Sequence, residues 1–220
     1  MHSYYNFERM AHIVLLGDSI FDNLSYTEGG PDVISQVRQL LLEGSQASLL
    51  AVDGATIQDV LPQLNRVPRD ATHLVLSAGG NDALMNAGIL DAPVDSTAQA
   101  LEALAAISQQ FEEKYRRVVA ACREFRLPLT ICTIYNGCFP EADYQRLVST
   151  ALMVFNDVIL RVGIQFGLTM IDLRFVCSLP DDYANPIEPS SIGGAKIART
   201  IVALASAGPA GSAGARVVIA

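Results

Sequence analysis

The sequence His12-Ile-Val-Leu-Leu-Gly-Asp-Ser-Ile20 decides the fold, because an apolar run in it leads directly into a small polar turn. The consecutive aliphatic residues 13–16 are typical of a strand that is covered on both faces in a parallel sheet. In an open parallel sheet, ligands bind beyond the carboxyl ends of the strands. The turn Gly17-Asp18-Ser19 is therefore the first candidate for a functional site.

Other short apolar runs have the same character, and longer helical patterns separate them. The clearest helix begins at Ser96, which forms a capping-box pattern with Gln99, and ends before Pro128. A second long helix is expected to stop at Gly167. This alternation predicts an α/β fold with a parallel sheet and right-handed crossovers. The predicted strands are 12–16, 47–52, 72–77, 129–134 and 168–173, and the remaining predicted helices are 32–43, 56–65, about 142–166 and 191–206.

Length and composition indicate one globular domain. The chain has 220 residues, of which 50% are hydrophobic and 17% charged, and this excludes general disorder. We expect a domain over 11–206, preceded by a polar extension at 1–10, in which Met10 is an alternative start. Residues 207–220 are rich in Ala, Gly and Ser and are predicted to be a flexible tail, although Val217-Val-Ile219 could dock.

Charge, cysteine usage and the lengths of the apolar segments indicate what kind of partner and location to expect. The formal net charge is −8 and no Lys/Arg cluster is present, which argues against a nucleic acid partner. The 4 cysteines form no C-x-x-C pair and are expected to be buried and reduced. No secretory signal is evident, and Asn156, Asp157 and Arg161 interrupt the apolar stretch 151–166. We therefore expect a cytoplasmic protein without a membrane span.

Small or polar residues follow each of the first three predicted strands. They are Gly17-Asp18-Ser19-Ile20, Asp53-Gly54-Ala55 and Gly79-Gly80-Asn81-Asp82. The Ser19 hydroxyl, placed where a strand turns into a helix, could attack a carbonyl carbon. The Ser19 N–H, the Gly54 N–H and the Asn81 amide could then stabilise the resulting oxyanion. Asp18 and Asp82 are expected to hold these turns by accepting hydrogen bonds from loop N–H groups.

These three blocks resemble those of the GDSL or SGNH hydrolase family, and the resemblance covers about residues 11–205. It implies a three-layer α/β/α sandwich of SGNH-hydrolase or flavodoxin-like type, with five parallel strands in the order 2-1-3-4-5. It also implies a serine nucleophile and, as substrates, small esters, acetylated sugars or lipid esters. No metal or organic cofactor is called for, because the sequence shows no cluster of metal ligands.

The last block departs from the family pattern. The family has D-x-x-H there, but this chain has Asn185 and Glu188 at the matching positions. His12 and His73 open predicted strands and His2 lies in the extension, so none of the three histidines is expected at the site. Glutamate has an ordinary pKa of about 4.3 against about 6.5 for histidine, a deficit of roughly 3 kcal/mol in basicity unless burial raises the pKa.

The leading interpretation is an ester hydrolase in which Ser19 attacks and Glu188 assists proton transfer. Asn185 either orients Glu188 or only turns the chain before Pro186. The alternative is a protein of the same fold that binds an acylated or anionic ligand with lost or altered hydrolysis. A nucleotide-binding domain is disfavoured, because the first loop lacks G-x-G-x-x-G and a P-loop lysine.

Two further expectations concern the surroundings of the site. Asp172 is expected to form a structural ion pair with Arg174 or a neighbour. The segment 84–95 is a candidate lid over the pocket, because it carries several apolar residues.

Overall fold

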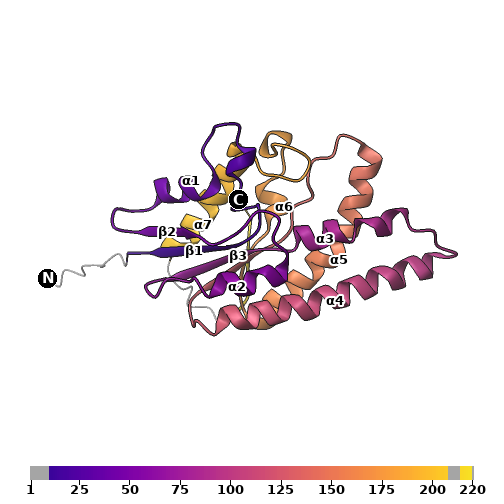
Figure 1. The fold of residues 1–220 in the computed structure, drawn as a ribbon, viewed down its shortest axis with the longest axis horizontal. Helices are drawn as coiled ribbons and strands as arrows, with labels where there is room; N and C mark the ends of the chain where they lie inside the picture. The colour runs from indigo at the N-terminus through magenta and orange to yellow at the C-terminus, as the bar shows by residue number, and fades with distance from the viewer. Residues whose placement is uncertain (1–9, 208–213, 220) are drawn as a thin grey trace.

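Six parallel strands form the central sheet of the computed structural model, which describes residues 10–207 and 214–219 (Figure 1). Their order is β2-β1-β3-β4-β5-β6. The order expected for the first five strands is therefore confirmed. Register pairs such as Leu15 with Leu49 and Gly17 with Ser77 fix the position of β1 between its neighbours. The strands are β1 (His12–Gly17), β2 (Gln46–Leu49), β3 (His73–Ser77), β4 (Leu129–Cys132), β5 (Thr169–Ile171) and β6 (Arg216–Val218).

The sixth strand corrects the prediction of five strands, and it corresponds to the docking that was left open for Val217-Val-Ile219. β6 pairs with β5, and the Asp172 N–H donates to the Val218 carbonyl at 2.9 Å. The consecutive valines 217 and 218 suit a strand, but their run was too short to identify one. Residues 208–213 and 220 of the predicted tail lie outside the described residues, as do residues 1–9 of the predicted extension with His2.

Helices cover both faces of the sheet (Figure 1). Val14 and Leu16 belong to the core under α2, α4 and α5, whereas Ile13 and Leu15 belong to the core under α1, α6 and α7. Since successive strand residues point to opposite faces, this explains why β1 is continuously apolar. The helices are α1 (Val33–Leu40), α2 (Val60–Leu64), α3 (Gly80–Met85), α4 (Thr97–Arg123), α5 (Ala142–Phe166), α6 (Leu173–Val176) and α7 (Ser191–Ser206), with short 3-10 turns η1 (Leu24–Tyr26), η2 (Ile57–Asp59), η3 (Ala87–Asp91) and η4 (Pro180–Asp182).

The two long helices agree with their sequence signals. The Ser96 side chain caps α4 by accepting from the Gln99 N–H, and Gly167 ends α5 in the left-handed conformation. Among the described residues, α5 is the one helix whose length and composition would allow it to cross a membrane. Its buried residues, such as Val158 and Val162, pack in the core against the sheet, and 33% of its most apolar 18-residue window is buried. The expected absence of a membrane span and the cytoplasmic location remain predictions.

Candidate active site

A tight turn at the end of β1 places Ser19 at the carboxyl edge of the sheet. Gly17 has φ +126°, and a Cβ there would lie 1.7 Å from the Ser77 carbonyl oxygen, so only glycine fits. The Asp18 N–H donates to the same oxygen at 3.2 Å. Ser19 follows and is buried, with 8% of its surface exposed. The junction between β1 and β3 thus fixes the position of Ser19.

The expectation that a helix begins at Ser19 is wrong. The Phe21 and Asp22 N–H groups donate to the Asp18 carbonyl in a short turn, and α1 begins only at Val33, with Asp32 as its cap. Any oxyanion donors near Ser19 are therefore loop N–H groups and side chains. No helix begins at Ser19 itself, and the helix whose first turn lies at the site is α3, with Gly80 and Asn81.

Hydrogen bonds tie the Gly54 turn to Asn81 and to the Ser19 loop. Asn81 lies in the first turn of α3, and its side-chain amide donates to the Ala55 carbonyl at 2.9 Å. The Asp53 N–H donates to the Asp22 carboxylate at 3.0 Å. Gly54 has φ +78° and is exposed. Asn81 lines the cavity described below, and Gly54 is not among its lining residues. One of the two Asn81 amide hydrogens therefore holds the Gly54 turn.

Glu188 lies in a short hairpin that joins η4 to α7. Tyr183 and Pro189 form an antiparallel bridge, and the Ala184 N–H donates to the Glu188 carbonyl at 2.9 Å. The Asn185 side-chain oxygen accepts from the Glu188 N–H and from the preceding N–H, both at 3.0 Å. These contacts correspond to turning the chain, the second of the two roles left open for Asn185. Among the described residues no hydrogen bond from the Asn185 amide reaches Glu188 Oε2.

Burial dominates the electrostatics of the two carboxyl groups that line the cavity. It raises the pKa of Glu188 to about 7, the Ser19 hydroxyl opposes this rise by hydrogen bonding, and the charge of Asp53 adds to it. Burial also raises the pKa of Asp18 to about 8, against the hydrogen bond from the Ile20 N–H. Glu188 is 7% exposed. At neutral pH its basicity is thus close to that of an ordinary histidine.

Asp18 and Asp82 make the turn-holding contacts that were expected. Asp18 accepts from the Ile20 N–H at 3.2 Å, and Asp82 accepts from the Ile57 N–H at 2.8 Å. Asp82 is buried, and burial raises its pKa. Asp82 thereby attaches the start of η2 to α3, directly beside Asn81.

An apolar cavity of about 110 Å³ opens from Ser19, Asn81 and Glu188. Among the described residues, the charged ones that line it are Asp18 and Glu188. The segment proposed as a lid contributes one wall through residues of α3 and η3. The other walls had no signal in the sequence, because they depend on how α4 and α5 pack. The principal apolar residues of the walls are Leu84, Ile89, Leu90, Leu104, Ile107, Ile134, Phe139, Val148, Ala151, Leu152 and Phe155.

The described histidines lie away from this cavity, as expected. His12 and His73 begin β1 and β3, whose other ends carry the site. The His12 ring lies 2.8 Å from the Ser48 hydroxyl and 3.1 Å from Asp70. Asp172 forms the expected ion pair with Arg174, at 2.6 Å. Within residues 10–207 and 214–219, no group of His, Cys, Asp and Glu side chains is arranged to hold a metal ion.

A doubly wound parallel sheet with a serine, an asparagine and a carboxyl group at its carboxyl edge defines an α/β protein with a candidate ligand site at that edge. The chain belongs to the GDSL-like lipase/acylhydrolase family, whose model matches residues 15–193. It is accordingly a hydrolase of the class that acts on ester bonds. The family resemblance seen in the sequence is confirmed.

Solved structures with the same fold include several esterases and lipases. Phospholipase A1 from Streptomyces albidoflavus has a TM-score of 0.65 at 13% identity, over 90% of this chain and 99% of that chain. The lipase/acylhydrolase from Enterococcus faecalis has a TM-score of 0.58 at 21% identity, over 89% and 97%. An acetylxylan esterase from Geobacillus stearothermophilus has a TM-score of 0.59 at 14% identity, over 90% and 96%. No curated protein sequence matches the chain.

Proposed function

We propose that the chain is a serine ester hydrolase in which Glu188 is the general base for Ser19. One observation carries the proposal: Ser19 and a buried carboxyl group with a pKa of about 7 line the same cavity. The sequence alone indicated a base weakened by about two pKa units. Burial removes this deficit, because a desolvated carboxylate binds a proton more tightly.

The reaction proceeds through an acyl-enzyme. The Ser19 oxygen bonds to the acyl carbon while its proton passes to the Glu188 carboxylate. The Ser19 N–H, the Gly54 N–H and the second Asn81 amide hydrogen stabilise the oxyanion. When the ester C–O bond breaks, Glu188 returns the proton to the leaving alcohol. A water molecule then attacks the acyl group with Glu188 again as base, which releases the acid and regenerates Ser19.

The acyl group of the substrate is apolar. The cavity walls beyond Ser19 consist mainly of aliphatic and aromatic side chains from α3, η3, α4, α5 and the segment after β4, with a few polar side chains such as Asn86 and Asn136. A charged or strongly polar acyl group would lose most of its hydration there and would find few hydrogen-bond partners in return. We therefore infer that aliphatic acyl esters are preferred over esters with polar acyl groups.

The test is hydrolysis of p-nitrophenyl esters from pH 4 to 9 by the wild-type protein, Ser19→Ala and Glu188→Gln. Activity should rise with pH through a midpoint of about 7, because only the ionised carboxylate accepts a proton. Ser19→Ala should lose about 10³-fold or more in kcat. Glu188→Gln keeps the side-chain shape and should lose roughly 10²- to 10⁴-fold.

A fluorophosphonate probe separates hydrolysis from binding without turnover. An activated Ser19 should be labelled in the wild-type protein, and labelling should fall in Glu188→Gln. Equal rates in the wild-type protein and Ser19→Ala, with no labelling of Ser19, would contradict the proposal and favour a ligand-binding protein of this fold.

A further inference from the structure

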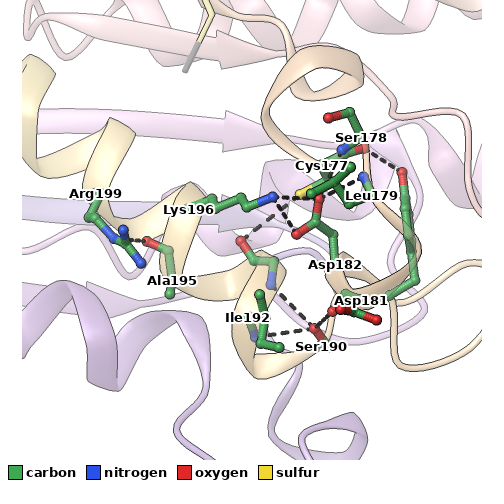
Figure 2. Close-up of polar contacts among 12 residues, drawn as sticks. Cys177, Ser178, Leu179, Asp181, Asp182, Ser190, Ile192, Ala195, Lys196 and Arg199 are labelled. Atoms are coloured by element: carbon green, nitrogen blue, oxygen red, sulfur yellow. Dashed lines mark hydrogen bonds and ion pairs between the residues drawn. The ribbon is translucent and has the colours of Figure 1, made fainter.

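The hairpin that carries Glu188 is anchored at its base by a buried ion pair (Figure 2). The Asp182 side chain is fully buried and accepts from Lys196 Nζ of α7 at 2.8 Å. The same carboxylate accepts from the Ser178 and Leu179 N–H groups, both at 2.9 Å. The Ser190 N–H donates to the Asp182 carbonyl at 2.9 Å. The two ends of the hairpin are thus held together.

The tip of the hairpin is held from two sides by buried side chains of other loops. The Tyr135 hydroxyl, from the segment after β4, donates to the Ile187 carbonyl at 2.6 Å. The Asn23 amide, from the loop after β1, donates to the Pro189 carbonyl at 3.1 Å. Tyr135 is 5% exposed and Asn23 is fully buried. The residues directly before and after Glu188 are therefore both fixed.

The Glu188 side chain itself has little support. Its Oε2 atom is buried and has no hydrogen-bond partner among the described residues. Asn185 accepts from backbone N–H groups and does not hold the carboxylate. Apart from the Ser19 hydroxyl itself, the position of the carboxylate therefore depends on the backbone that carries it. A misplacement of about 1 Å in a reacting group can cost roughly 10²-fold in rate.

We propose that Tyr135 and Asn23 are positioning residues that hold Glu188 against Ser19 through the two carbonyl groups flanking it. The proposal rests on the function proposed above. It assigns the orienting role, which the family's aspartate would have, to a tyrosine and an asparagine on the loops after β4 and β1. Their hydrogen bonds reach the backbone on either side of Glu188, and Tyr135 also lines the cavity into which Glu188 faces.

The first variant is Tyr135→Phe, which removes only the hydroxyl and keeps the ring packed edge-on against Tyr183. Its kcat should fall roughly 10-fold, with KM changed less than about twofold. The pH midpoint should move below about 7, because a looser hairpin admits water to Glu188 and lowers its pKa. Asn23→Ala should give the same signature, measured well below its thermal midpoint.

Two tyrosine variants serve as matched controls. Tyr115 is fully buried and its hydroxyl has no partner among the described residues, so Tyr115→Phe should leave kcat and the pH midpoint unchanged. Tyr183 donates to the Cys177 carbonyl at 2.6 Å, a bond as short as that of Tyr135 but to a carbonyl outside the hairpin. Tyr183→Phe should lower stability and leave the pH midpoint in place.

Several outcomes would overturn the positioning role. One is a Tyr135→Phe variant with kcat within twofold of the wild type and an unshifted midpoint. Another is a change in KM alone that varies with acyl length, which would make Tyr135 a substrate contact. Glu188→Gln, measured in parallel, separates the two proposals. If Glu188→Gln loses activity and Tyr135→Phe does not, only the positioning role is contradicted. If Glu188→Gln keeps full activity, the proposed function itself is contradicted.

Discussion

A glutamate can replace a histidine as a base at neutral pH only if its pKa rises by about two units. In this protein burial supplies that rise at Glu188, and the charge of Asp53 adds to it. The sequence showed the substitution but not its environment. Position 188 lies just before a helix, where a solvated carboxylate would be expected. Its burial depends on a hairpin that is held by Tyr135 and Asn23, two residues distant from it in the sequence.

Restoring the family's residues tests how much the site depends on Glu188 itself. Glu188→His should retain activity to within about 10-fold of the wild type, whereas Glu188→Gln should not. Histidine has an ordinary pKa of about 6.5, and the burial that raises the glutamate pKa would lower that of histidine and keep it neutral, the form that accepts a proton. The double variant Asn185→Asp with Glu188→His should be at least as active as the single histidine variant. An aspartate at position 185 could keep the turn and also accept a hydrogen bond from the histidine. A histidine variant as inactive as Glu188→Gln would mean that the base must be a carboxylate. Steady-state kinetics on one p-nitrophenyl ester decides between these outcomes.

The buried carboxyl of Asp18 should make stability depend on pH. Its pKa is about 8 in the folded protein against an ordinary 3.8, so the folded state binds more protons than the unfolded state between these values. The free energy of unfolding should therefore fall as the pH rises from about 4 to 8. Asp18→Asn should remove part of this fall, since the amide stays neutral. Urea unfolding of both proteins at about pH 5, 6.5 and 8 measures the difference. If the free energy of unfolding falls with pH to the same extent in both proteins, Asp18 is not the source of this pH dependence.

At the scale of elements, helix α5 contributes side chains both to the hydrophobic core and to the wall of the cavity. Phe155 lies in the core cluster and also lines the cavity, and Ala151 lines it one turn earlier. Ala151→Trp should fill part of the cavity and lower kcat/KM roughly 10-fold or more for long acyl esters. Acetyl ester hydrolysis should change little. Ala106→Trp on α4 is the matched control, because Ala106 is exposed and does not line the cavity. Equal losses for short and long esters in Ala151→Trp would contradict the assignment of this cavity to the acyl chain.

The sequence predicted most elements, and the reasons for its failures differ. β1 was predicted from its apolar run and α4 from its Ser96 cap. Such signals lie within the element itself, so the sequence is enough to identify it. The turn after Ser19 was misread as a helix start because Ser is also a common N-cap. β6 has only three residues, and its pairing with β5 depends on contacts distant in sequence.

Candidate site residues were predictable where a turn motif carries them. Ser19 and Asn81 follow strands, so the topology alone brings them to one edge of the sheet. Tyr135 and Asn23 have no such signal. Their partners, the carbonyls of Ile187 and Pro189, are backbone groups that any sequence would offer. Only the packing of three loops shows their connection to Glu188.

For the molecule as a whole, β6 protects the edge of the sheet next to β5. The Arg216 N–H donates to the Leu168 carbonyl at 3.2 Å, and the Val218 carbonyl accepts from the Asp172 N–H at 2.9 Å. In a parallel ladder alternate residues face the same neighbour, so the Val217 N–H points away from β5. An unprotected β5 would present free backbone groups to other chains.

Proline at the two neighbouring positions of β6 tests this role. Arg216→Pro removes a hydrogen bond to β5 and should lower stability by about 1 kcal/mol, or roughly 2–4 °C in the thermal midpoint. Val217→Pro should be tolerated better, because its missing N–H faces away from β5. Both variants should keep the wild-type kcat and pH midpoint, since β6 lies outside the cavity lining. Calorimetry and light scattering measure the midpoint and the self-association. Equal destabilisation by the two prolines would mean that β6 contributes by side-chain packing and not by its hydrogen bonds to β5.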